Sequence, residues 1–414
     1  MNLTEPQKPL FGHKEFLPNW KAAFLTFLLI TTMPLDAMSQ TYQVERLNSG
    51  EPIITAEMFA ELGATEREGR SINGATLVKL PEWLAEEDRA DSSAEYYLYF
   101  AHHGGHYIRM AWATDPVGPF TLYRVGEEIP VGSRGVLDMG EDRLIQAAEH
   151  YQFKLHIASP EVLVDDENRR FVMYFHGVGE GGVAGQYSMP AVSVDGLDFR
   201  DGLQPCAATS SYFRAFHVNG QAYAFGNGCS LYRAPEGARA TDDIAIRPPE
   251  DFRPGYYWKE LKEFRNKIEG EWAEKLKVGK PKPPENVGRD DFQIRHCALL
   301  PVGQNRFHLF YTVKMNPIDP PERIFMSHFD ASDPDWRNWT LSPAEEILRP
   351  EREWEGAGEE LKASRFGGGR GKNELRDPYV FRDTDDTLYL YYSGSGEGAI
   401  GVARLTPTNP ANQQ

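Results

Sequence analysis

The sequence predicts an all-β protein with the fold of a five-bladed β-propeller. Two observations carry this prediction: a pair of short strands joined by a polar turn recurs five times, and most pairs lead into a third strand that ends in a polar turn. Aromatic residues make up 12% of the 414 residues and concentrate in the predicted strands, as suits an all-β chain. One such unit cannot bury its apolar face alone, so the units are expected to stack on one another.

The C-terminal unit is the clearest copy. Arg376-Asp377-Pro378-Tyr379 opens its first strand, residues 382–386 form a polar turn, and residues 387–393 form a second strand of alternating aromatic and aliphatic residues. Because Pro378 restricts the residue before it, we expect Asp377 to be extended.

The other four units are degenerate copies of this one. Their first and second strands are residues 72–78 and 96–102, 157–164 and 171–177, 211–216 and 218–225, and 294–300 and 306–312. The inner strands are predicted to start near Asn73, Glu161, Arg214, Arg295 and Asp377. The segment after Gln40 is predicted to close the ring by pairing with the last unit.

The chain is expected to contain one domain behind a targeting segment. Lys14 and Lys21 precede an apolar run at residues 22–33, and small residues follow, so residues 1–39 are predicted to be a signal peptide. An uncleaved anchor is the alternative. Export implies a periplasmic or extracellular protein. Residues 40–410 are assigned to the propeller.

The rhythm of the strands breaks between the third and fourth units. Residues 236–290 are predicted to be a helical insertion, because Trp258, Leu261 and Phe264 begin an apolar stripe over residues 256–276. The insertion either walls the site or protects the edge of a blade.

Charge and cysteine content narrow the range of partners. A net charge of −17 argues against nucleic acid and against stable binding to an anionic membrane.

Cys206 and Cys229 are close enough in sequence to bridge one blade, but an odd total of three cysteines and their place in predicted strands favour buried thiols. The oligomeric state stays open.

Three short motifs carry a resemblance to a known superfamily: Ser159-Pro160-Glu161-Val162, Arg376-Asp377-Pro378-Tyr379 and the turn at residues 115–120. With the blade rhythm, they make residues 70 to 405 similar to the five-bladed propeller glycosidases, the superfamily of arabinanases, xylosidases, invertases and levansucrases. The resemblance implies a glycoside hydrolase. The sequence departs from the catalytic trio that is usual in this superfamily. Asn73 stands in place of the first-blade aspartate, Glu161 in place of the second-blade aspartate, and Arg214 where the third-blade glutamate is expected.

Inner strands of a propeller converge on one funnel, so residues that open them are candidates for the site. Hydrolysis of a glycosidic bond needs an acid and a second carboxylate. The predicted catalytic residues are Glu161, Asp377 and His103. The alternative for Asp377 is a structural role in holding a turn. The alternative for Glu161 is an ion pair with one of the funnel arginines. Histidine serves as acid or base near neutral pH, but His102 and His103 would face opposite ways on a strand and are not expected to chelate together.

Further funnel residues are expected to bind substrate: Asn73, His102, His176, Arg214, Arg295, His296 and Arg376. Arginine recognises carboxylates and sulfates with two parallel hydrogen bonds, so the arginines favour an anionic sugar. Neutralisation of nearby carboxylates is the other interpretation of the same residues.

The predicted function is an exported glycoside hydrolase acting on plant or algal oligosaccharides or polysaccharides. Two alternatives stay open: a lyase that uses a His or Tyr base on uronates, and a propeller that binds glycans without cleaving them. We expect no cofactor and no catalytic metal. A structural calcium in the channel is a further alternative, since oxygen ligands suit it.

Overall fold

The computed structural model describes residues 40–408, except for gaps at residues 104, 141–144, 149–150, 181–184, 205, 245–255, 265–266, 268–292, 315–318 and 366–367. The chain divides into two compact units, Met1–Leu35 and Asp36–Gln414, and all described residues belong to the second. The predicted signal peptide therefore lies outside the described residues. Within them, no helix is both long enough and apolar enough to cross a membrane.

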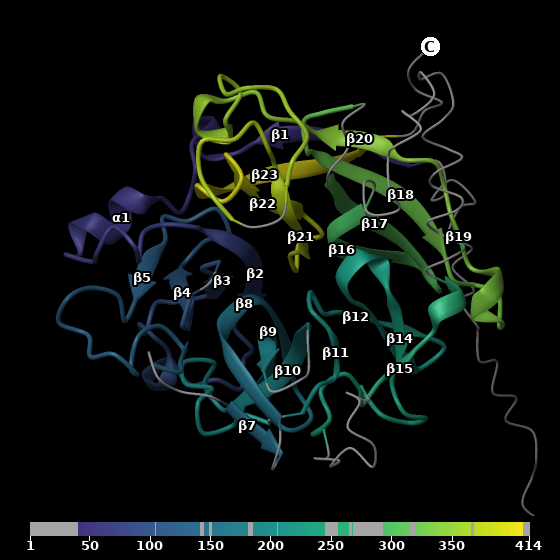
Figure 1. Cartoon of the computed structure of the whole chain (residues 1–414), viewed down its shortest axis with the longest axis horizontal. Coiled ribbons are helices and arrows are strands. Elements are labelled where there is room, and N and C mark those ends of the chain that lie inside the picture. Colours follow the sequence, from purple (N-terminus) through teal and green to yellow (C-terminus); the bar gives the residue numbers. More distant parts are fainter. Residues whose placement is uncertain are drawn as a thin grey trace, which may run out of the picture. The chain divides into compact units, whose positions relative to one another are not determined.

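Five antiparallel sheets surround a common centre, as Figure 1 shows, and this confirms the predicted five-bladed propeller. From its inner strand outward, blade 1 comprises β2 (Asn73–Lys79), β3 (Tyr96–Ala101), β4 (Tyr107–Ala113) and β5 (Thr121–Tyr123), with β6 (Leu137–Asp138) also paired to β4. Blade 2 comprises, in the same order, β8 (Tyr151–Asp165), β9 (Arg170–Glu180), β10 (Gln186–Ser193) and β11 (Thr209–Ser210), with β7 (Ile145–Ala148) beside β8. Blade 3 comprises β12 (Arg214–Val218), β13 (Gln221–Phe225), β14 (Leu231–Arg233) and β15 (Lys259–Glu260).

The last two blades complete the ring. They comprise β16 (Gln293–Gly303), β17 (Arg306–Lys314), β18 (Ile324–Asp330) and β19 (Thr340–Leu341) with β20 (Glu345–Leu348); and β21 (Arg376–Arg382), β22 (Leu388–Gly394), β23 (Ala399–Thr408) and β1 (Thr41–Arg46). β1 pairs with β23 from Thr41 opposite Thr408 to Arg46 opposite Ala403, which confirms the predicted closure by the segment after Gln40.

Helices are few in the described residues. They are α1 (Ala56–Glu61) and the short 3-10 helices Asn48–Gly50, Glu86–Asp88, Asn227–Cys229, Trp336–Asn338 and Glu353–Glu355.

Apolar side chains fill the spaces between neighbouring blades. Each of the five buried clusters in the described residues combines residues of two adjacent blades: blades 1 and 2, 2 and 3, 3 and 4, 4 and 5, and 5 and 1. Burial of both faces of every sheet explains why the strands have nearly continuous apolar sequences. It also explains why no single unit is stable alone.

Four of the inner strands carry the same β-bulge, near the start of β2, β16 and β21 but in the middle of β8. The predicted start of the second inner strand near Glu161 is wrong, because pairing with β9 and β7 extends β8 back to Tyr151. In β2, β8, β16 and β21 the register skips one residue on the inner strand relative to its neighbour, between Asn73 and Thr76, Ala158 and Glu161, Ile294 and Cys297, and Arg376 and Tyr379. In each case the residue after the bulge lies opposite a buried tyrosine: Tyr99, Tyr174, Tyr311 or Tyr391. Bulges bend a strand and redirect side chains, often beside active sites.

The bulges define two layers of residues along the channel. We call the positions two residues before the tyrosine partners the opening layer (Gly74, Ser159, Arg295 and Asp377) and the positions opposite the tyrosines the second layer (Thr76, Glu161, Cys297 and Tyr379). Blade 3 places Arg214 opposite Phe225 in the second layer, and Tyr212 in the opening layer. Glu161 and Asp377 therefore do not occupy equivalent positions in their blades.

Four of the opening-layer residues have a left-handed backbone. Gly74, Ser159, Tyr212 and Asp377 have φ between 48° and 67°. The extended geometry expected for Asp377 before Pro378 is wrong, because the bulge places it in the left-handed region at φ 49°. Strained non-glycine residues persist where surrounding contacts hold them, and they are frequent at functional sites.

The predicted helical insertion differs from the structure at its start. Lys259–Glu260 form β15, the outer strand of blade 3, and helical residues begin only at 262. Trp258, Leu261 and Phe264 are buried, so the apolar stripe first serves the core of the propeller. The remainder of the stripe lies outside the described residues. None of the three cysteines forms a disulfide, so Cys206 and Cys229 do not bridge the blade. Cys229 and Cys297 are buried as expected, whereas Cys206 is half-buried.

Candidate active site

Arg376 is the centre of a buried network in the channel. Its Nη1 donates to Glu397 Oε1 at 3.0 Å, its Nε donates to Glu374 Oε2 at 2.8 Å, and Glu322 Oε2 lies 3.8 Å from Nε. Arg376 is fully buried, and the three carboxylates come from different loops or strands of blades 4 and 5. A buried guanidinium with this many acidic partners is an internal counterion, so its hydrogen-bonding groups are already used.

Glu397 joins this network to blade 1. Ser71 Oγ and Asn73 Nδ2 donate to its Oε2 at 2.6 and 3.0 Å, and His103 Nδ1 lies 3.6 Å from its Oε1. Burial would raise the pKa of Glu397, but the charges of Arg376 and His103 outweigh burial and lower it. Glu397 is therefore an ionised carboxylate that orients His103.

Asp377 and His296 form a second carboxylate–imidazole pair. His296 Nδ1 contacts Asp377 Oδ1, and Ser393 Oγ lies 3.5 Å from Asp377 Oδ2. Burial would raise the pKa of Asp377, but His296 and the nearby Arg376 lower it to about 2. Burial lowers the pKa of His296 despite the opposing charge of Asp377. Contact with the carboxylate fixes the proton on Nδ1 and makes Nε2 the basic nitrogen.

Aromatic rings connect the two pairs around the channel. The ring centroids are 4.9 Å apart for His103 and His156, 5.3 Å for His156 and His176, 4.9 Å for His176 and Tyr212, and 4.4 Å for Tyr212 and His296. Neither ring nitrogen of His176 has a hydrogen-bond partner among the described residues. Burial lowers the pKa of His176 well below its usual value and that of His156 to about 4, so both rings are neutral at pH 7.

Glu161 lies in the second layer and pairs with Arg214. The distance from Arg214 Nη1 to Glu161 Oε2 is 3.0 Å, but the angles are not those of a hydrogen bond, and Oε2 has no other partner among the described residues. Arg214 donates to the carbonyl oxygens of Cys297 at 3.1 Å and Phe213 at 3.0 Å. Burial raises the pKa of Glu161 to about 7, although Arg214 acts in the opposite direction.

Most of the predicted site residues come together in one network. Asn73, His103 and Arg376 all contact Glu397. His296 contacts Asp377, and Arg295 Nη1 lies 3.4 Å from Glu322 Oε2. The His176 ring packs against Tyr212, which in turn packs against His296. Glu161 and Arg214 form a separate pair one layer away. His102 points elsewhere, with Nε2 2.9 Å from the carbonyl oxygen of Arg67.

The three funnel arginines, Arg214, Arg295 and Arg376, are all paired with buried carboxylates. Neutralisation is thus their observed role. Arg295 also donates through Nη2 to the carbonyl oxygen of Arg365 at 2.6 Å. An anionic ligand would have to compete with these partners, so the arginines of the channel are not available for it.

Sequence reasoning missed Glu397 and Glu322. Glu397 lies in the turn between β22 and β23, which corresponds to the turn after β3 that holds His102 and His103. The rule that selected those histidines would have selected Glu397 in blade 5. Glu322 lies between β17 and β18, the second and third strands of blade 4, which is the position in its blade that Glu397 has in blade 5. Among the described residues, no group of three or more His, Cys, Asp or Glu is arranged to hold a metal ion.

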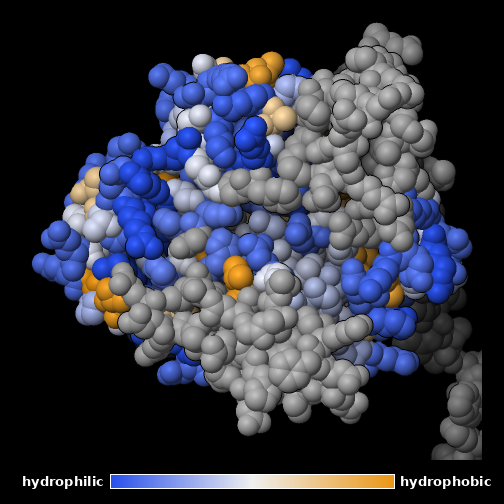
Figure 2. All heavy atoms as spheres, viewed as in Figure 1, coloured by the Kyte–Doolittle hydropathy of each residue, from blue (hydrophilic) through white to orange (hydrophobic). Residues whose placement is uncertain are grey.

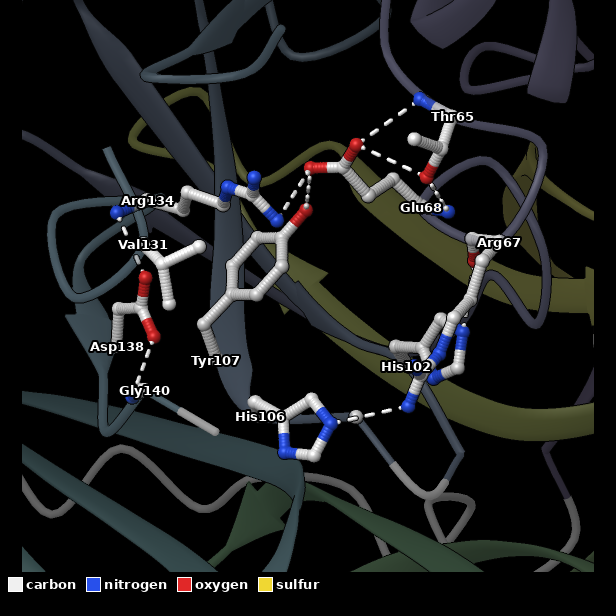
Figure 3. Close-up of a pocket in the computed structure, with 11 residues that line it drawn as sticks. Thr65, Arg67, Glu68, His102, His106, Tyr107, Val131, Arg134, Asp138 and Gly140 are labelled. Atoms are coloured by element: carbon white, nitrogen blue, oxygen red, sulfur yellow. Dashed lines mark hydrogen bonds and ion pairs between the residues drawn. The ribbon is translucent and has the colours of Figure 1, made fainter. Parts of the chain in front are cut away.

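The site opens at a pocket that we call the mouth pocket. Its volume is about 640 Å³, and Ser71, His102 and His103 lie in its wall together with Arg67, Arg70 and Arg370. A neighbouring pocket of about 360 Å³ shares Arg67 and His102 with it (Figure 3). His103 thus connects the accessible space to Glu397.

Comparisons with known proteins agree with the fold. No protein-family model matches the chain. An uncharacterised protein of Acanthamoeba polyphaga mimivirus is 26% identical over 339 residues, which cover 81% of this chain and 83% of that protein. A crystal structure of a glycosyl hydrolase from Bacteroides ovatus is 15% identical, with a TM-score of 0.50 over 90% of this chain and 94% of that chain. The predicted resemblance to five-bladed propeller glycosidases is confirmed at the level of fold.

Proposed function

We propose that the protein is a carbohydrate-active enzyme, a glycoside hydrolase whose acid–base groups are two histidines held by carboxylates. The proposal rests mainly on one observation: His296 contacts Asp377, and His103 lies 3.6 Å from Glu397, in the same channel. Fold analogy with propeller glycosidases supports a sugar substrate but does not assign the reaction.

Hydrolysis needs a base for water and an acid for the leaving oxygen. In this proposal His296 Nε2 takes a proton from the water that attacks the anomeric carbon. His296 is suited to this role because its lowered pKa leaves it neutral at pH 7. His103 gives a proton to the glycosidic oxygen as the bond to the anomeric carbon breaks, and Glu397 balances the charge of the His103 imidazolium. The net change is one proton moved from His103 to His296, which solvent exchange reverses.

Glu161 has a supporting role in this proposal. A carboxyl with a pKa of about 7 is chemically suited to act as an acid. Its second-layer position and its pairing with Arg214 favour a role in filling the channel below the sugar. Asp377 acts through His296 by fixing its tautomer, so it is a positioning residue.

A uronate lyase is the second candidate. Tyr212 lies between His176 and His296, at centroid distances of 4.9 and 4.4 Å, and this arrangement suits a phenol that exchanges protons with imidazole. A lyase removes the proton next to the uronate carboxylate and leaves an unsaturated sugar.

The test is a panel of neutral, uronic and sulfated polysaccharides assayed with the full chain. Release of reducing ends without ultraviolet absorbance supports hydrolysis, and both signals together indicate a lyase. Wild-type protein that binds glycans but releases no product from any of them would contradict both enzyme proposals and leave a binding propeller.

We further propose that the enzyme is exported, on the basis of the apolar run at residues 22–33 after Lys14 and Lys21. N-terminal sequencing of the mature protein tests this. A mature protein that begins at Met1 and stays in the cytoplasmic fraction would contradict it.

A further inference from the structure

The mouth pocket is strongly basic in an acidic protein. Three arginines and two histidines lie in its wall with Ser71 and two glycines, and among the described residues no aspartate or glutamate lines it. The chain as a whole has a net charge of −17. A local excess of positive charge at the entrance of a site attracts anionic ligands and repels cations.

Two of these arginines have no carboxylate partner. Within the part of the chain that the structure describes, neither Arg67 nor Arg370 forms an ion pair, and both side chains are exposed. Glu57 and Glu66 lie within electrostatic reach of Arg370: local hydrogen bonds are the main cause of their lowered pKa, and the charge of Arg370 adds to it. Arg70, by contrast, is paired with Glu66. The arginines of the channel, such as Arg376, have their donors occupied by buried carboxylates. Arg67 and Arg370 therefore have donors available for a ligand.

Arg67 is held in place between the two neighbouring pockets. Its Nη2 lies 3.0 Å from His106 Nε2, and its carbonyl oxygen is 2.9 Å from His102 Nε2, as Figure 3 shows. Burial lowers the pKa of His102 to about 4, so His102 is neutral at pH 7. The positive charge at this side of the mouth thus comes from the guanidinium.

Arg370 is held close to the proposed acid by two glycines. A Cβ on Gly368 would lie 2.4 Å from Glu397 Oε2 and 2.8 Å from His103 Cβ, so only glycine allows the loop to pass there. Gly369 has φ +144°, and its carbonyl oxygen accepts a hydrogen bond from the amide of Glu397 at 3.1 Å. The loop therefore places Arg370 directly after a segment that touches the His103–Glu397 pair.

Two guanidiniums on the rim of one pocket suit an oxyanion with several acceptor atoms. A carboxylate or a sulfate offers coplanar or tetrahedral oxygens to which arginine donates two hydrogen bonds at once. A neutral sugar hydroxyl offers no such match. The face of the described residues around the centre of the ring is mainly hydrophilic (Figure 2), which fits a polar ligand.

We propose that Arg67 and Arg370 select a saccharide whose residue at the mouth pocket carries a carboxylate or sulfate group. This inference rests on the proposed function for the identity of the ligand as a sugar. It assigns the anion to the rim of the site and to different arginines from those that the sequence suggested.

The test is isothermal titration calorimetry in the His296→Gln background, so that binding is measured without turnover. Four probes are compared: an oligogalacturonate, its carboxyl-reduced counterpart, a sulfated galactan oligosaccharide and its desulfated counterpart. One anionic probe is expected to bind at least about tenfold more tightly than its neutral match, with weaker binding as salt rises. The carboxylate and sulfate pairs show which group is recognised.

The double substitution Arg67→Ala with Arg370→Ala is expected to abolish this preference. Arg337→Ala is the matched control, because Arg337 is also exposed but pairs with Asp335 away from the pocket. Equal affinity for both members of each pair, no binding of any probe, or an unchanged preference in the double variant would overturn the inference. Turnover of neutral glycans without such a preference would overturn this inference alone. An arginine-dependent preference without turnover in the wild-type protein would contradict only the proposed hydrolase.

Discussion

Asp377 and Glu161 lie in adjacent layers of one channel, each beside a basic partner, yet their pKa values are shifted in opposite directions. His296 contacts Asp377, whose pKa falls to about 2. Arg214 lies 3.0 Å from Glu161, whose pKa rises to about 7. Formal charge alone would predict the reverse, because arginine is always charged and histidine is not.

The difference comes from the number of charged or basic neighbours. Asp377 contacts His296 and lies close to two cations, Arg376 and Arg295, and all three lower its pKa. Glu161 has one cation, and that guanidinium donates instead to backbone carbonyl oxygens such as that of Cys297. Burial therefore dominates at Glu161 and is outweighed at Asp377. Both carboxylates are buried, so the number of charged neighbours, and not the depth of burial, decides which of them keeps its proton.

The largest effect is expected from His296→Gln. Loss of the proposed base should reduce kcat by about a hundredfold or more with folding intact, measured by release of reducing ends. The wild-type kcat/KM should also fall on acidification below pH 6.5, as His296 becomes protonated. His328→Gln is the control: His328 is buried and lies 3.6 Å from Glu345, but on β18, outside the channel network. A loss in the control as large as in His296→Gln would indicate a general effect of removing a buried histidine.

The second prediction compares the two arginines. Arg376→Met leaves three buried carboxylates without their common cation and should destabilise the protein by about 3–5 kcal/mol. Arg214→Met should cost clearly less, because Glu161 can take up a proton near pH 7. Urea denaturation at pH 6 measures both. Equal losses would contradict the difference between the two arginines.

The third prediction concerns pH and Glu161. Its pKa is about 7 in the folded protein against 4.5 as the ordinary value, so the folded state binds the proton more tightly. The contribution of Glu161 to stability is therefore fully present below about pH 4.5 and is lost as pH rises to about 7. The shift corresponds to about 3 kcal/mol.

Glu161→Gln resembles the protonated form and removes this loss. Relative to wild type, the variant should gain stability between pH 5 and pH 8, and the gain is read from urea denaturation at both values. A difference between variant and wild type that does not change with pH, or that moves the other way, would show that the carboxyl is ionised throughout this range.

The smallest effect is expected from Ser393→Ala. The 3.5 Å contact with Asp377 Oδ2 is long for a hydrogen bond, so its loss should cost at most about 1 kcal/mol and change kcat less than threefold. A large loss of kcat with an unchanged melting temperature would mean that Ser393, as well as His296, positions Asp377.

Much of the fold could be predicted from the sequence because it depends on local patterns. The strand pairs, the closure through the segment after Gln40 and the starts of β2, β12 and β21 follow from alternation and turn residues. The start of β15 could not be predicted, since Lys259–Glu260 become a strand only by pairing with β14. Similarly, the bulge that turns Asp377 into a left-handed conformation is set by its neighbours in the sheet.

Most members of the site could be predicted, but Glu397, Glu322 and the pairing of the side chains could not. Asp377 and His296 lie on the inner strands of neighbouring blades and are far apart in the sequence, so their contact depends on how blades 4 and 5 pack together. Glu161 and Asp377 look alike in the sequence, each beside a proline, yet the register places Glu161 one layer further along the channel. Side-chain partners of this kind arise from tertiary packing, which a single sequence does not encode in any local pattern.

Parallel measurement of kcat/KM for Asp377→Asn and Glu161→Gln at pH 7, on a substrate that the wild-type enzyme cleaves, tests the central claim most directly. The account predicts a loss of about a hundredfold or more for Asp377→Asn, because His296 loses the carboxylate that fixes its tautomer. It predicts a change of less than about threefold for Glu161→Gln, which removes only the transferable proton of a second-layer carboxyl. A well-folded Glu161→Gln variant that loses as much activity as Asp377→Asn would contradict the account and make Glu161 the catalytic acid.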